Sequence, residues 1–68
     1  MTNRKELEVN HLMLTHEITY HQNCIDTWKF RQNFLYEDWE SAIDHATSER
    51  DRLIAERNFV TKQLRGEV

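Results

Sequence analysis

Three side chains in the N-terminal half have the types and the spacing of metal ligands. Glu17, His21 and Cys24 lie at positions i, i+4 and i+7, so an α-helix would place them on one face. Carboxylate, imidazole and thiolate groups all bind first-row transition metals. A ferritin-like di-iron bundle needs Glu-x-x-His on two helices, whereas that motif occurs here once, as Glu8 and His11. We therefore expect ordinary interface residues and no cofactor, and keep a metal-binding helical bundle as an alternative hypothesis.

The sequence contains no grouping of residues that is typical of an enzyme. With one cysteine, two serines and a single glycine near the C-terminus, it offers no glycine loop to build an oxyanion hole. It also lacks a Walker loop and a dinucleotide fingerprint. His11, His16 and His21 recur every five residues, which rotates each by about 140° and prevents one helix from bringing them to one ion. We predict a protein without enzymatic activity.

The chain is short and mildly acidic. Its 68 residues make at most one helical domain, residues 1–68, and a chain of this size buries only about 60% of its unfolded surface. Because the single Cys24 cannot form an internal disulfide, self-association is expected to supply the missing core. The net charge of −3 argues against nucleic acid as a partner. No apolar run suits a signal peptide or a membrane span, so we expect a cytoplasmic protein without a membrane partner.

Two amphipathic helices should carry these residues. The chain has no proline and one glycine, so few positions favour a tight turn. Apolar residues recur at spacings of three and four in two stripes, which predict an all-α fold with helices over residues 4–32 and 37–65. Asn3 and Gly66 suit the start of the first helix and the end of the second. The residues expected in the core of the hairpin or dimer are Leu7, Leu14, Ile18, Ile25, Trp28, Trp39, Ile43, Ala46, Leu53, Val60 and Leu64.

A break in helical phase predicts where the chain turns. Phe30 and Phe34 fall on the polar side of the first helix, so a continuous straight helix would expose both. We place the turn within residues 31–38, with Asp38 capping the second helix and Glu37 and Glu40 in its first turn. The expected fold is an antiparallel two-helix hairpin. One long coiled-coil helix is the alternative, because a heptad interval also runs through the break.

The expected fold-back at about residue 35 sets a register between the two helices. It places Trp28 against Ala42 and Ala46, a large residue against small ones, and brings Glu17 towards Arg50. The apolar arc of the first helix is wider than one seam requires. Two hairpins are therefore expected to dimerise into a four-helix bundle.

The stretch WKFRQNFLYEDW, residues 28–39, concentrates aromatic and acidic side chains around the predicted turn. We expect the two phenylalanines either to close the corner or to remain outside as anchors, with nearby acids facing a basic surface of a partner. The predicted function is that of a small inhibitor or adaptor that binds a larger protein. The residues assigned to this contact are Phe30, Phe34, Tyr36, Glu37, Asp38, Glu40, Asp44 and Phe59.

The segment SERDRLIAERNFVTKQL, residues 48–64, resembles the coiled-coil tails of many small bacterial and phage proteins. This resemblance covers a quarter of the chain and is not specific to one family. It implies a coiled-coil helix in a small phage-type protein. A structural or assembly protein that polymerises as a coiled coil is therefore a second alternative function.

Overall fold

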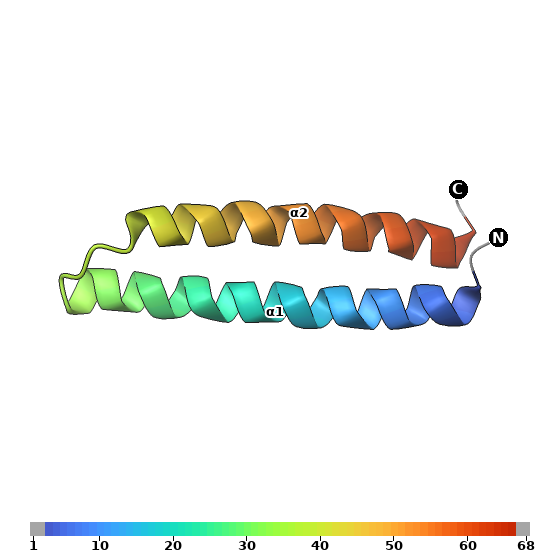
Figure 1. Ribbon diagram of the computed structural model, residues 1–68, viewed down its shortest axis with the longest axis horizontal. Helices are drawn as coiled ribbons and strands as arrows, with labels where there is room; N and C mark the ends of the chain where they lie inside the picture. The colour runs from blue at the N-terminus through green and yellow to red at the C-terminus, as the bar shows by residue number, and fades with distance from the viewer. Residues whose placement is uncertain (1–2, 67–68) are drawn as a thin grey trace.

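A computed structural model describes residues 3–66 as two long helices, α1 (Arg4–Phe34) and α2 (Glu40–Arg65). They lie side by side and antiparallel, with the start of α1 beside the end of α2 and the connection at the opposite end (Figure 1). The molecule is a rod that measures 50 × 16 × 14 Å. The predicted all-α hairpin is confirmed, and the alternative of one long helix is wrong.

Both outer helix ends are capped by the residues that the sequence suggested. The side chain of Asn3 accepts a hydrogen bond of 2.9 Å from the backbone N–H of Lys5, which satisfies one free donor of the first turn of α1. At the other end Gly66 adopts a φ of 74°, and its N–H bonds to the carbonyl of Gln63 at 3.1 Å. A left-handed residue at this place is typically glycine, because a Cβ atom is disfavoured there.

The inner helix ends differ from the expected boundaries by two and three residues. Helix α1 continues to Phe34 because the N–H of Leu35 still completes an i to i−4 bond of 2.9 Å with Arg31. Helix α2 begins only at Glu40, with Trp39 as its N-cap residue. Asp38 does contribute to the start of α2, since its Oδ1 accepts a hydrogen bond of 3.2 Å from the N–H of Glu40. Glu37 lies in the connection, so its expected place in the first turn of α2 is wrong.

The core is a narrow seam between the helices. Its centre is a cluster of Ile25, Ile43 and Ala46, with Trp28 and Trp39 packed against it. Among residues 3–66, only Ile25 is completely buried. The structure buries seven hydrophobic side chains, all of which are among the eleven expected core residues, and leaves the other four, Leu14, Trp28, Trp39 and Leu64, half-buried.

Two hydrogen bonds between the helices define their register. Arg4 Nη1 donates to the carbonyl of Leu64 at 3.0 Å, and Arg50 Nη1 donates to Gln22 Oε1 at 2.8 Å. These pairs agree with a fold-back near residue 35. Arg50 also forms an ion pair of 2.9 Å with Asp51, so its partners are Gln22 and Asp51 and not the expected Glu17.

Candidate protein-binding site at the corner

The connection between the helices places an aromatic residue in a backbone conformation that favours glycine. Tyr36 has a φ of 56°, the only positive value among the non-glycine residues 3–66. This left-handed conformation costs an ordinary L-residue roughly 1–2 kcal/mol. Nothing about the side chain repays that cost within the chain, because Tyr36 is 92% exposed.

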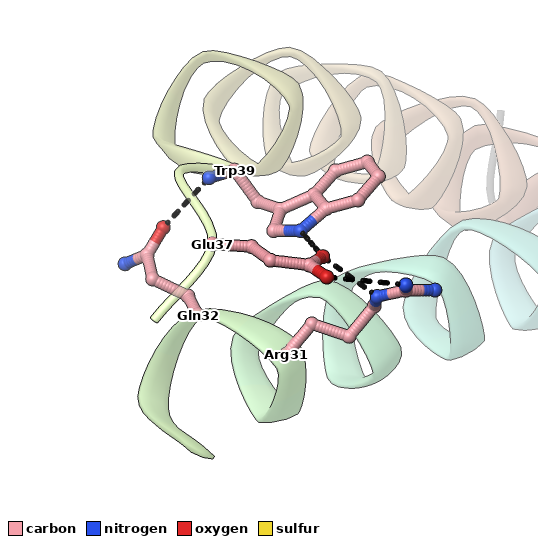
Figure 2. A network of polar contacts seen from close by, with 4 residues as sticks. All are labelled: Arg31, Gln32, Glu37 and Trp39. Carbon is pink, nitrogen blue, oxygen red and sulfur yellow. Dashed lines mark hydrogen bonds and ion pairs between the residues drawn. The ribbon is translucent and has the colours of Figure 1, made fainter. Parts of the chain in front are cut away.

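A network of four polar side chains holds the connection against α1. Figure 2 shows the carboxylate of Glu37 between Arg31 and Trp39. It accepts hydrogen bonds of 2.9 and 3.3 Å from the guanidinium of Arg31 and one of 2.7 Å from Trp39 Nε1. The backbone N–H of Trp39 donates to Gln32 Oε1 at 3.2 Å. The network therefore satisfies two donors of Trp39 and joins the last turn of α1 to the start of α2 (Figure 2).

The same contacts shift the pKa values of Arg31 and Glu37. Hydrogen bonds from Arg31 first, and then from Trp39, hold the pKa of the Glu37 carboxyl below its ordinary value. The hydrogen bond to Glu37 and its negative charge raise the pKa of Arg31. Glu37 is therefore an internal contact of the corner, held in its charged form.

Two tryptophans pack the inner side of the corner. The rings of Trp28 and Trp39 stack with centroids 5.7 Å apart and an angle of 6° between their planes. The guanidinium carbon of Arg31 lies 5.5 Å from the centroid of Trp39, within the range of a cation–π contact. Trp39 is thus fixed by Trp28, Arg31, Gln32 and Glu37 together.

The outer side of the corner carries a cluster of exposed hydrophobic residues, which we call the aromatic tip. Phe30 and Phe34 contact each other with ring centroids 4.9 Å apart and are 58% and 66% exposed. Leu35 and Tyr36 follow Phe34 in the sequence and are 54% and 92% exposed. The aromatic tip therefore consists of Phe30, Phe34, Leu35 and Tyr36. Of the two places foreseen for the phenylalanines, the structure shows the outer one.

The acidic residues assigned to partner contact have different surroundings. Glu37 is engaged in the network, and Asp38 is exposed but bonded to the start of α2. Glu40 and Asp44 are exposed on the first turns of α2, close in sequence to the aromatic tip. Phe59 does not join this group, because it lies on the later part of α2, where it lines a groove shared with α1.

The residues considered as metal ligands do not form a site in the part of the chain that the structure describes. No group of three or more histidine, cysteine, aspartate or glutamate side chains converges there on a position for a metal ion. His21 instead contacts the ring of Tyr20, with centroids 5.6 Å apart. Cys24 is a half-buried free thiol, and Glu17 lines the groove that also contains Phe59.

Three residues of the corner had not been singled out from the sequence. Arg31 and Gln32 carry no recognisable pattern, because their partners lie across the turn and become neighbours only after the chain folds back. Leu35 could have been found, since it stands between Phe34 and Tyr36 at the phase break.

Comparisons of this chain with models of protein families, with curated proteins and with solved structures found no match. Within residues 3–66, neither helix contains an apolar stretch able to cross a bilayer.

Proposed function

We propose that the protein is a small, non-enzymatic interaction module that inhibits or adapts a larger protein by inserting its aromatic tip into that partner. The observation that carries this proposal is the exposed pair of Phe30 and Phe34, in contact at 4.9 Å and continued by two more exposed apolar residues. Contiguous apolar surface that faces water on a soluble chain is typical of a binding site. Large aromatic side chains are also the commonest anchors of protein interfaces.

The backbone at Tyr36 supports the same proposal. An aromatic residue that is exposed and held at a positive φ contributes little to the stability of the hairpin. Strained residues of this kind cluster at functional sites, where the surrounding structure holds them in place. Here the network of Arg31, Glu37 and Trp39 supplies that support. The tip would then be presented in one conformation, which lowers the entropy cost of binding.

The charge around the tip suggests the chemistry of the partner. Glu40 and Asp44 are exposed on the adjacent start of α2, whereas the charged carboxylate of Glu37 already forms an ion pair with Arg31. We therefore propose a partner with an apolar pocket and a basic rim, and we leave Glu37 out of the contact. Exposed charges at such a rim mainly raise the association rate and fix orientation.

The proposal is tested by affinity capture from the native host lysate with the wild-type chain and with a Phe30→Ala, Phe34→Ala variant. We expect the wild type to recover a specific larger protein, identified by mass spectrometry, and the variant to lose at least about nine-tenths of it, because truncation of anchors costs about 2 kcal/mol or more.

The matched control is a Val9→Ala, Leu12→Ala variant. These two residues also lie on α1 and are 50% and 57% exposed, but they are far along the helix from the corner. The control should recover the partner as well as the wild type does. The proposal would be contradicted if both variants lost the captured partner equally, or if the wild type recovered no other protein.

A further inference from the structure

A groove runs between the helices near the end of the hairpin that is remote from the aromatic tip. It has a volume of about 710 Å³. Six of its ten lining residues are apolar, among them Leu7, Met13, Leu14, Phe59 and Val60, and four are polar, among them Glu17 and Glu56. Met13 and Phe59 stand on its two walls and are 57% and 54% exposed. The groove thus leaves a hydrophobic surface open on one side of the rod.

On the opposite side of the seam, a polar pair bridges the two helices. Gln22 is nine residues from Met13 on α1, and Arg50 is nine residues from Phe59 on α2, which corresponds to half a turn around each helix. Gln22 and Arg50 are hydrogen-bonded to each other at 2.8 Å across the seam. Met13 and Phe59 are the exposed large hydrophobic residues that line the groove, and no such bond covers them there.

The accessible area of the chain is larger than that of a compact monomer of the same mass. The hairpin exposes 5330 Å², whereas a compact monomer of 8.3 kDa is expected to expose about 4,600 Å². The excess is roughly 750 Å², close to the 800 Å² or so that each partner buries in an interface of standard size. The radius of gyration is also larger than that of a compact chain of this length, at 15.3 Å against about 11 Å.

We propose that a second copy of this chain covers the groove, so that two hairpins pack groove to groove around a two-fold axis and form a four-helix bundle. In such an isologous contact the same surface serves both copies, and Met13 and Phe59 of each copy fill the groove of the other. The net charge of −3 per chain gives only weak repulsion between the copies. The aromatic tip lies outside this contact and stays free.

The test is analytical ultracentrifugation of the wild type over a concentration series, with circular dichroism of each sample. We expect a mass that rises with concentration to twice 8.3 kDa and no further. Met13→Glu and Phe59→Glu should each shift the chain to the monomer, because a charge would be buried in the contact. Leu12→Glu is the matched control, since Leu12 is as exposed as Met13 but does not line the groove, and it should leave the dimer intact.

Two further variants keep the test decisive if a glutamate in the groove also unfolds the hairpin. Met13→Ala should raise the dissociation constant by roughly tenfold relative to Leu12→Ala. Glu17→Leu should lower it, because a carboxylate would no longer be buried beside the apolar contact. Three results would each overturn the inference. The wild type could remain monomeric, Leu12→Glu could disrupt the dimer as strongly as Met13→Glu, or the groove could bind only a different protein. Variants of the aromatic tip should not alter the dimer, so this result is independent of the proposed function.

Discussion

Trp28 and Trp39 stack across the corner with their rings 5.7 Å apart and only 6° from parallel. Trp28 comes from α1, and Trp39 is the N-cap residue of α2. Because Trp39 also donates hydrogen bonds to Glu37 and Gln32, the stack joins the apolar seam to the polar network. The corner is therefore a built structure that fixes how the aromatic tip is presented.

The tryptophan stack should appear as a coupling energy in a double-mutant cycle. Trp39→Ala is expected to lower the free energy of unfolding by about 2 kcal/mol, less than for a fully buried tryptophan because the ring is half-buried. Trp28→Ala should have a similar effect, and the two effects should deviate from additivity by about 1 kcal/mol. Urea unfolding followed by circular dichroism measures all four free energies. Strict additivity would show that the rings do not interact.

The contribution of Glu37 should depend on pH. Its pKa in the folded chain lies below the ordinary value of 4.5, so the charged form stabilises the fold. This stabilisation is complete at pH values above the unfolded pKa and disappears as the pH falls through the folded pKa. The difference in unfolding midpoint between the wild type and Glu37→Gln should therefore be largest near neutrality and shrink steadily below about pH 4.5.

Arg31 provides the control for this pH dependence. In an Arg31→Gln background the main cause of the lowered pKa is absent, so Glu37→Gln should then change the midpoint much less at neutral pH. Arg52 lowers the pKa of Glu49 in a similar way. Because Glu49 is present in every variant, its contribution to the pH dependence cancels when the variants are compared. The assignment of the Arg31–Glu37 contact would be contradicted if Glu37→Gln changed the unfolding midpoint equally in both backgrounds. It would also be contradicted if the effect of Glu37→Gln grew as the pH fell.

The two phenylalanines of the tip should contribute little to stability. Because both are more than half exposed, Phe30→Ala with Phe34→Ala should lose only the contact between them, about 0.5 kcal/mol. Ile25→Ala should cost about 2–5 kcal/mol, since Ile25 is completely buried in the centre of the seam. Thermal and urea unfolding of the two variants measure this contrast. A double variant as unstable as Ile25→Ala would place the phenylalanines in a core.

Tyr36 should separate stability from binding. Tyr36→Gly relieves the left-handed backbone and is expected to leave the free energy of unfolding unchanged or to raise it by up to about 1 kcal/mol. Tyr36→Val should lower it, because a β-branched residue tolerates a positive φ poorly. The glycine variant should nevertheless capture less partner. Loss of stability on Tyr36→Gly would show that the tyrosine is retained for the fold.

The hairpin could be predicted from the sequence because its determinants are local. The two apolar stripes, Asn3 at the first cap and Gly66 at the last cap are patterns within a few residues. The phase break at Phe30 and Phe34 located the turn for the same reason. An apolar residue out of phase with its helix either ends the helix or faces water, and here Phe34 does both.

The corner could not be predicted in detail because its contacts depend on the path of five residues. Glu37 was expected to serve α2, yet Arg31 of α1 lies close enough to bind it with two hydrogen bonds. Phe59 was predicted from the sequence to belong to the same partner contact as Phe30 and Phe34, although α2 carries it towards the other end of the rod. To assign a residue to the corner, one must know its distance from residues of the other helix. The spacing of residues along the sequence does not give that distance.

The most direct test of the proposed binding surface is site-specific photocrosslinking in the native host. A benzophenone side chain would replace Phe34 in one sample and Leu12 in another, since both are exposed residues of α1. We predict that position 34 forms a covalent adduct with one larger, different protein and that position 12 does not. The proposal would be contradicted if position 34 gave no adduct beyond that seen at position 12, or cross-linked only to a second copy of the chain.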